Sequence, residues 1–454
     1  MIELLRAAAE QRATQDAVVT TRRSTTFSQL LELAECAAAN LAARGITRFA
    51  ILDDNPTHVF ALLAGSALAG AEACVYPLAA TDEAVATNRE RFDHEYIVTN
   101  RASLNGVGAI DAGAIETVDL LQDHGAPRLG SAPSAAPLLV MTTGTSGYPR
   151  AVRHDWDRIL LGSRRIAPAA DQKWLLAYGL NQFGGLQILI HVLAAQATLI
   201  AADSFQPRDG LAAMRKWGVT HASGTPTFWR FLLIEMRSDD GEIPPLRQVT
   251  MGGEAVPSAL LRQVGEQFPT ANVSQIYGAT EFGQNVTVRD GLAGLPISML
   301  SGDGAVVFKV IDGELWVKSQ ASMLGYYNED PVQAGSWRAT GDLVEVVGDR
   351  IEFRGRKSEV INVGGIKVHP LPVEDRIGRV NGVALVHAFG RPNAMVGSIV
   401  AVEVVLSPGH SADDVDAEIR AVCADLPPAA RPRSIRFVET MNTTGNKINR
   451  GVSK

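Results

Sequence analysis

The sequence has few cysteines and no pattern that would pair them or bind zinc. Cys36, Cys74 and Cys423 are scattered over 454 residues, and no C-x-x-C spacing occurs. An odd number of isolated cysteines supports neither a disulfide framework nor a zinc site. This cysteine usage predicts a reducing compartment, and we expect the cytoplasm.

Runs of positive charge and long charge-free apolar runs are also missing. The net charge is −7, which argues against a nucleic-acid partner because such proteins usually present a basic face. The segment 1–6 meets charged residues too early for the apolar part of a signal peptide. Polar residues interrupt the apolar stretches 60–78 and 186–202, so each predicts a buried helix that runs into a strand rather than a membrane span.

The two common nucleotide-binding fingerprints are absent, since neither G-x-x-x-x-G-K-[ST] nor G-x-G-x-x-G after a strand occurs. Instead, the apolar run 137–141 leads into small and hydroxylated residues. Glycine lets backbone N–H groups wrap an anion, and hydroxyl groups add donors. The pattern predicts a phosphate loop or, taken alone, an ordinary surface turn. The predicted contacts are Thr142, Thr143, Gly144, Thr145, Ser146 and Gly147, with positive charge from Arg150.

The length predicts two or more domains. Helical and strand-like patterns alternate to about residue 290, as in helix 27–43 and strand 49–52, which favours an α/β fold with doubly wound sheets. Short strands after residue 304 indicate a small antiparallel subdomain. The sequence beyond residue 356 indicates a compact α+β domain. We therefore predict domains 1–357 and 358–454, with the boundary near Ser358.

Four further motifs follow the predicted phosphate loop. They are Tyr277-Gly278-Ala279-Thr280-Glu281, Thr340-Gly341-Asp342, the segment 355–370, and the segment 443–450 around Lys447. In content and order the five motifs resemble the adenylate-forming superfamily of acyl- and aryl-CoA ligases, peptide-synthetase adenylation domains and firefly luciferase. The resemblance covers most of the chain and is closest to the CoA ligases.

The resemblance implies that ATP activates a small carboxylic acid to an acyl-AMP with release of pyrophosphate, and that the acyl group then passes to a thiol. It also implies individual roles around the nucleotide. A hydroxyl group beside a carboxylate suits phosphate and Mg²⁺. The implied contacts are Thr280 to the α-phosphate, Glu281 to Mg²⁺, Tyr277 and Gly278 beside adenine, Asp342 to the ribose, and Arg356 to ribose or phosphate.

Lys447 is the strongest catalytic candidate, because the resemblance implies that it reaches the α-phosphate and carboxylate as a point charge. By position alone it would be a solvated tail lysine. The resemblance implies that the C-terminal domain is mobile and that Ser358 occupies its hinge, where the family usually has Asp or Lys. The chain also departs from the family pattern elsewhere, since the family usually has Lys at Arg150, Gly at Ala151 and Asn446, and Pro at Met441. We expect altered kinetics rather than loss of function.

The resemblance also places the acyl and thiol sites. Asn181, Gln182, Gly184 and Gly252 are expected at the acyl pocket, and Gly253 and Glu254 belong to the loop between the acyl and adenine pockets. No Asp is present there to pair an amino group, which disfavours an amino-acid substrate. Gly364 and Gly365 would let backbone approach pantetheine. The acceptor is CoA or a carrier-protein phosphopantetheine, and a luciferase-like oxygenase or a catalytically silent relative are alternatives.

Overall fold

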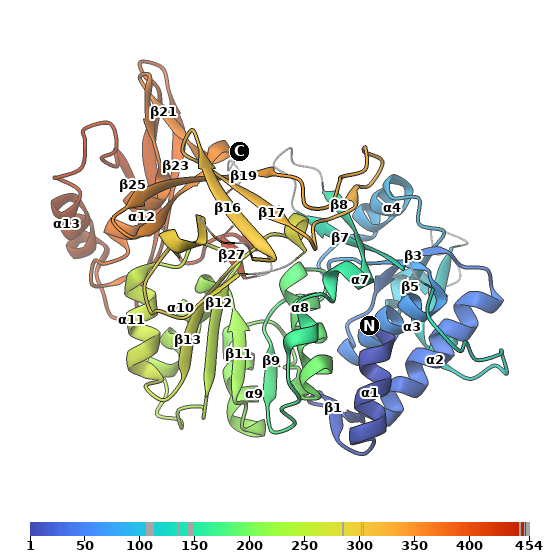
Figure 1. The fold of residues 1–454 in the computed structure, drawn as a ribbon. Coiled ribbons are helices and arrows are strands. Elements are labelled where there is room, and N and C mark those ends of the chain that lie inside the picture. Colours follow the sequence, from blue (N-terminus) through green and yellow to red (C-terminus); the bar gives the residue numbers. More distant parts are fainter. Residues whose placement is uncertain are drawn as a thin grey trace.

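The computed structural model describes residues 1–105, 113–133, 136–142, 149–283, 286–300, 302, 304–444, 446–448 and 450. Two large sheets organise the N-terminal part (Figure 1). The inner strands of the first sheet are parallel and its edge strands are antiparallel. Its strands, in spatial order, are β14 (Val286–Val288), β13 (Asn272–Tyr277), β12 (Gln248–Gly252), β11 (His221–Gly224), β9 (Lys173–Leu176), β10 (Thr198–Ile200), β1 (Asp16–Val19) and β2 (Ser24–Thr26).

The second sheet is parallel except where β8 and β18 join it. Strand β3 is buried over most of its length, as expected for a parallel strand covered on both faces. The strands, in spatial order, are β18 (Gly325–Tyr326), β8 (Arg150–Asp155), β7 (Pro137–Thr142), β4 (Glu72–Val75), β3 (Arg48–Leu52), β5 (Tyr96–Thr99) and β6 (Ala114–Glu116).

One shared core joins the two sheets, because helices between them contribute apolar side chains to both. These helices are α1 (Ile2–Arg12), α2 (Phe27–Ala43), α3 (Pro56–Ala69), α6 (Thr117–Leu121), α7 (Trp156–Ile159) and α8 (Phe183–Ala195). Further helices cover the outer faces. They are α9 (Pro207–Trp217), α10 (Pro226–Arg237) and α11 (Ser258–Gln267) on the first sheet, and α4 (Asp82–Arg91) and α5 (Ala102–Asn105) on the second. This arrangement confirms the predicted α/β class.

The apolar stretches 60–78 and 186–202 run from α3 into β4 and from α8 into β10. Within the described part of the chain, no helix combines the length and apolarity needed to cross a membrane.

A small antiparallel sheet follows, with its own core. Its strands are β15 (Leu295–Pro296), β20 (Arg350–Arg356), β19 (Arg338–Val347), β17 (Glu314–Ser319) and β16 (Val306–Ile311). Thr340-Gly341-Asp342 is a sequence typical of a tight turn, but the structure places no turn there. These residues form a bulge inside β19, where the register against β17 shifts and Gly341 adopts a φ of +76°.

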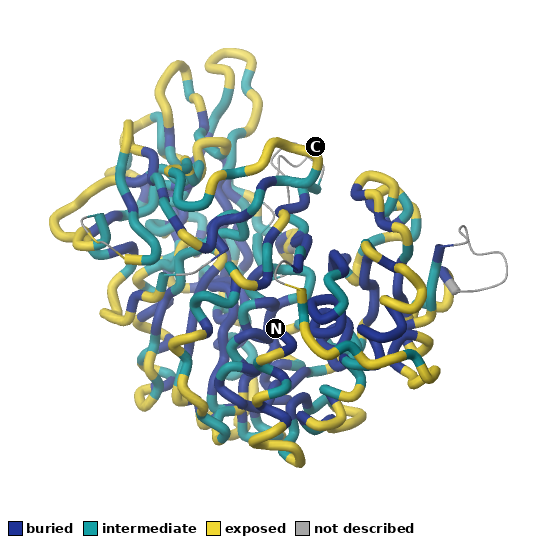
Figure 2. The backbone as a smooth tube through the Cα atoms, turned by 45° about the vertical axis from the view of Figure 1, so that its right-hand side comes forward, coloured by how far each residue is buried: buried dark blue, intermediate teal, exposed yellow. Residues whose placement is uncertain are grey.

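The C-terminal domain consists of one sheet and two helices around a separate core. Its elements are β21 (Ile361–Val363), β22 (Ile366–Val368), α12 (Pro370–Ile377), β23 (Val383–Asn393), β24 (Gly397–Leu406), α13 (Ala412–Val422) and β25 (Ser434–Phe437). The hairpin of β26 (Thr443–Thr444) and β27 (Lys447–Ile448) follows. Figure 2 shows buried segments inside the large domain and exposed loops around the surface of the molecule.

Helix α10 of the large domain packs against the C-terminal domain. Phe231 and Ile234 on this helix pack against Leu385 and Val405 of the C-terminal sheet. Met441, which stands where the family usually has proline, is buried in the same contact. The domains therefore meet through an apolar interface.

Candidate active site

A cavity of about 2650 Å³ lies between the large domain and the C-terminal hairpin. Ligands of α/β proteins usually bind at the carboxyl ends of parallel strands. The cavity lining fits this rule, since it includes the segments that follow β3, β4, β9, β12 and β13, together with residues of β7, β19, β20 and β27.

Lys447, on β27, enters this cavity across Gly253. A Cβ atom at Gly253 would lie 2.8 Å from Lys447 Cε and 2.9 Å from its Nζ, so a larger residue would collide with the lysine. The φ of Gly253 is +86°, which also favours glycine. Burial lowers the pKa of Lys447, while the charge of Glu254 partly opposes this. The Glu254 carboxylate accepts hydrogen bonds from Ile448 N–H at 2.9 Å and from the Thr227 hydroxyl at 2.8 Å. Glu254 thus fixes the strand that carries the lysine.

Asn446, immediately before the lysine, explains one departure from the family pattern. Its φ is +58°, a left-handed conformation that asparagine tolerates better than most residues. Its Nδ2 donates to the Phe205 carbonyl at 2.8 Å, and its own carbonyl accepts from the Thr225 hydroxyl. The side chain that replaces glycine therefore ties the lysine turn to the large domain.

Asp342 forms a compact polar group with Arg356 and Tyr277. Its carboxylate accepts from the Tyr277 hydroxyl at 2.7 Å and lies 3.2 Å from Arg356 Nε. Burial raises the pKa of Asp342, and the Arg356 charge works against that rise. The Asp342 charge in turn raises the pKa of Arg356. All three residues line the cavity, as does Gly278.

Thr280 and Glu281 begin the short helix η2 (Thr280–Phe282) at the end of β13. The Glu281 carboxylate accepts from the Tyr326 hydroxyl at 2.8 Å. His154, fully buried on β8, lies with Nε2 2.7 Å from the Thr280 carbonyl. Burial lowers the pKa of His154 to about 4, so the ring is neutral at pH 7 and its Nε2–H donates to this carbonyl. The histidine therefore helps to fix the position of the backbone at Thr280.

Arg150 lies at the start of β8, beside the predicted phosphate loop. Its guanidinium stacks 3.4 Å from the centre of the Tyr326 ring, and its Nη2 lies 2.6 Å from Glu329 Oε2. Both Arg150 and Thr142 line the cavity. The loop contacts predicted between them, Thr143, Gly144, Thr145, Ser146 and Gly147, lie outside the described residues.

The predicted acyl residues Asn181, Gln182, Gly184 and Gly252 all line the cavity. The Gln182 Oε1 accepts from Gly179 N–H at 3.2 Å and so holds the loop before α8. The Tyr178 hydroxyl donates to the Gly252 carbonyl at 3.2 Å. The tyrosine thereby joins the segment after β9 to the end of β12.

Several residues of the cavity lining had not been predicted: Trp174, Tyr178, Gln187, His191 and Tyr326. Glu329, which pairs with Arg150, had not been predicted either. The spacing of Gln187 and His191 was the available signal. Polar residues four apart in an otherwise apolar helix share a face, and that face is placed toward a polar site.

Gly364 and Gly365 are not brought to the cavity. They form the exposed turn between β21 and β22, which Figure 1 shows at the outer end of the C-terminal domain. Ser358 lies in the exposed short helix η4 (Lys357–Glu359) between β20 and β21. It lines the cavity, whereas the glycine pair does not.

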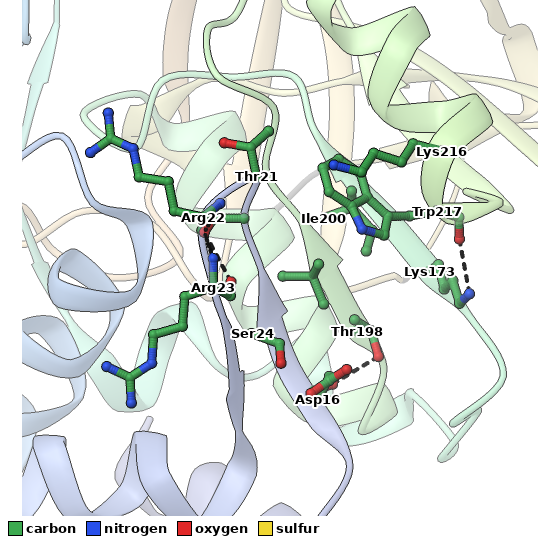
Figure 3. A pocket seen from close by; sticks show the side chains of 12 residues that line it. Asp16, Thr21, Arg22, Arg23, Ser24, Lys173, Thr198, Ile200, Lys216 and Trp217 are labelled. Atoms are coloured by element: carbon green, nitrogen blue, oxygen red, sulfur yellow. Dashed lines mark hydrogen bonds between the residues drawn. The ribbon is translucent and has the colours of Figure 1, made fainter.

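A second, shallower pocket of about 420 Å³ lies over β1, β2 and the end of α9. Four cationic side chains surround it, but they do not converge (Figure 3). Arg22 and Arg23 point away from the other two, Lys173 donates to the Trp217 carbonyl at 2.9 Å, and Lys216 lies over the Trp217 ring. The pocket therefore offers no built anion site.

Comparison with known proteins identifies the family of both domains. The AMP-binding enzyme model matches residues 5–327, and the model of the AMP-binding enzyme C-terminal domain matches residues 372–447. A 4-chlorobenzoate–CoA ligase from Arthrobacter is 26% identical over 458 residues, covering 90% of this chain and 85% of the relative. A 3-[(3aS,4S,7aS)-7a-methyl-1,5-dioxo-octahydro-1H-inden-4-yl]propanoyl:CoA ligase from Mycobacterium tuberculosis is 26% identical over 352 residues, covering 74% and 67%.

Among solved structures, the anthranilate CoA ligase AuaEII in complex with anthranoyl-AMP superposes with a TM-score of 0.86 at 19% identity. The match covers 99% of this chain and 95% of that one. Together with the family match over both domains, this full-length likeness confirms the fold that the five motifs imply. The chain belongs to the AMP-binding enzyme family.

Proposed function

We propose that this protein is an AMP-forming acid–thiol ligase, which joins a carboxylic acid to the thiol of CoA by way of an acyl-AMP. The observation that carries the proposal is the position of Lys447. The C-terminal domain delivers this cation over Gly253 into a cavity that also contains Thr280, Asp342 and Arg356.

The first half-reaction needs positive charge and hydrogen-bond donors where negative charge develops at phosphorus. A carboxylate oxygen of the acid forms a bond to the α-phosphorus of ATP, and the bond to pyrophosphate breaks. Lys447 and the Thr280 hydroxyl are assigned to the α-phosphate and Asp342 to the ribose hydroxyls. Arg150 is assigned to the departing phosphates, for which it must leave Glu329.

A magnesium ion fits Glu281. This ion usually takes one or two protein carboxylates and completes its shell with phosphate oxygens and water. Glu281 is a partly exposed carboxylate in the cavity, oriented by Tyr326. When bound, the ion neutralises phosphate charge.

The second half-reaction transfers the acyl group from AMP to a thiol, with AMP as the leaving group. CoA is the proposed acceptor, and carrier-protein phosphopantetheine is the alternative. Gly364 and Gly365 are assigned to the thiol arm, although their turn lies outside the cavity in this structure. The C-terminal domain, residues 358–454, must therefore rotate about the segment near Ser358.

The two curated relatives named above are ligases of ring-bearing acids. We extend this class to the present protein, since Trp174, Tyr178 and Phe183 contribute aromatic rings to the cavity. The three cysteines are buried and unpaired in the structure, which supports function in the reducing cytoplasm.

The test is acid-dependent turnover of ATP with a panel of benzoates, arylpropanoates, cycloalkyl acids and straight-chain acids. We expect AMP and pyrophosphate in equal amounts, a requirement for Mg²⁺, and an acyl-CoA when CoA is present. Formation of ADP, or turnover that ignores the acid, would refute the proposed function.

A further inference from the structure

One face of α8 and the segment formed by β9 and the residues after it contribute two walls of the cavity. The lining residues of α8 include Gly184, Gln187, Ile188 and His191, which follow the helical spacing of three, four and seven. On the other wall, Trp174 and Leu176 lie on one face of β9, and Tyr178, two residues beyond the end of the strand, continues the alternation. Both elements therefore face the cavity along most of their length.

These walls define a channel of measurable depth. Seven residues of helix separate Gly184 from His191, a rise of about 10 Å. Trp174 and Tyr178 are four residues apart, or about 13 Å along an extended chain. The Tyr178 end is tied to Gly252, whose neighbour Gly253 lies against Lys447. The far end is closed by the Trp174 and His191 rings, whose centroids are 4.4 Å apart. An acid with its carboxylate beside Lys447 would extend along this channel.

Gln187 lies between the two ends and has an unused donor. Its Nε2 is buried and has no hydrogen-bond partner among the described residues. Buried polar groups are almost always paired, so an unpaired amide on a cavity wall indicates a partner supplied by a ligand. Neither wall contributes Lys or Arg to the cavity, and burial lowers the pKa of His191 to about 4, which leaves this ring neutral. The partner is therefore an uncharged acceptor rather than a second carboxylate.

We propose that Gln187 selects acids that carry a neutral carbonyl oxygen on the ring or chain remote from the carboxylate, by donating its amide hydrogen to that oxygen. The proposal rests on the proposed function and adds the substrate class. It makes Gln187 a specificity-determining residue that the adenylation chemistry itself does not require.

The test compares cyclohexylpropanoate with its ring ketone, two acids of nearly equal shape. The kcat/KM of pyrophosphate release is measured for the wild type and for Gln187→Met, which keeps the length of the side chain and removes the amide. We expect the wild type to prefer the ketone. We expect Gln187→Met to lower kcat/KM for the ketone about 10- to 100-fold, while the parent acid changes by less than about threefold. Gln263→Met, on the exposed face of α11, is the matched control.

A wild-type preference for the parent acid would overturn the proposal, as would an equal loss for both acids in Gln187→Met. Calorimetric titration of the two acids separates this proposal from the proposed function. Tighter binding of the ketone that disappears in Gln187→Met supports the role of Gln187 even if no pyrophosphate is released. Pyrophosphate release with no preference that depends on Gln187 refutes this inference and leaves the proposed function standing.

Discussion

The large domain holds Lys447 in place through Glu254, whose carboxylate accepts a hydrogen bond from the N–H of the next residue, Ile448. Replacing Lys447 with alanine should lower the adenylation rate by about two orders of magnitude or more, because a preorganised charge is lost at the reacting phosphate. Supplied acyl-AMP should still be converted to thioester. The measurement is pyrophosphate exchange beside thioester formation, with Lys216→Ala as the control for an exposed lysine. An equal fall in both half-reactions would make Lys447 structural.

The pH dependence offers a second readout of the same residue. Lysine carries its charge only below its pKa, and burial lowers the pKa of Lys447. Adenylation should therefore decline on the alkaline side at a lower pH than the titration of a free lysine would give, while the conversion of supplied acyl-AMP should not follow that decline.

A separate prediction concerns Asn446, whose backbone adopts a left-handed conformation and whose side chain bonds the large domain. Asn446→Gly keeps the left-handed conformation and loses the bond to the Phe205 carbonyl. We expect adenylation to fall about 5- to 10-fold, the usual effect of one neutral hydrogen bond. Asn446→Ala adds the strain of a left-handed alanine and should fall further. Pyrophosphate exchange measures both variants, and an Asn446→Gly variant as fast as the wild type would show that the amide contact is dispensable.

At the scale of elements, most helices and strands could be predicted because local signals agreed with the final packing. Helix α2 begins where Thr26 and Gln29 form a capping box and ends as predicted from its apolar spacing. The bulge at Gly341 could not be predicted in this way. Its turn-forming residues are the same in a hairpin and in a bulge, and only the pairing of β19 with β17 decides between them.

The α8 wall shows a different limit of sequence reasoning. Gln187 and His191 interrupt an apolar run, which indicates a buried helix but not whether the polar atoms find partners inside the protein. That depends on β9, whose residues are adjacent only in space. The motif residues Thr280, Glu281, Asp342 and Arg356 could be predicted to line one cavity because a family pattern links them, whereas no such pattern pointed to Gln187 and His191.

At the scale of the whole molecule, one domain carries both Lys447 and the Gly364–Gly365 turn, and the structure brings only the lysine to the cavity. Ser358→Pro should therefore separate the two half-reactions. Proline holds φ near about −65°, which a 3₁₀ turn such as η4 already uses, so the present arrangement should survive. Adenylation should persist while thioester formation from supplied acyl-AMP and CoA collapses. Ser358→Ala is the control, and unchanged rates in the proline variant would place the pivot elsewhere.

The interface between α10 and the C-terminal sheet also has a thermal consequence. Phe231, Ile234, Leu385 and Val405 are packed together when Lys447 is in place, and a rotating domain must separate them. Newly wetted apolar surface raises the heat capacity, and its cost falls on cooling. The equilibrium between the arrangement with Lys447 in the cavity and the rotated arrangement should therefore shift toward the rotated one as the temperature drops. Cooling should then slow adenylation more than the temperature dependence of its chemical step alone would predict.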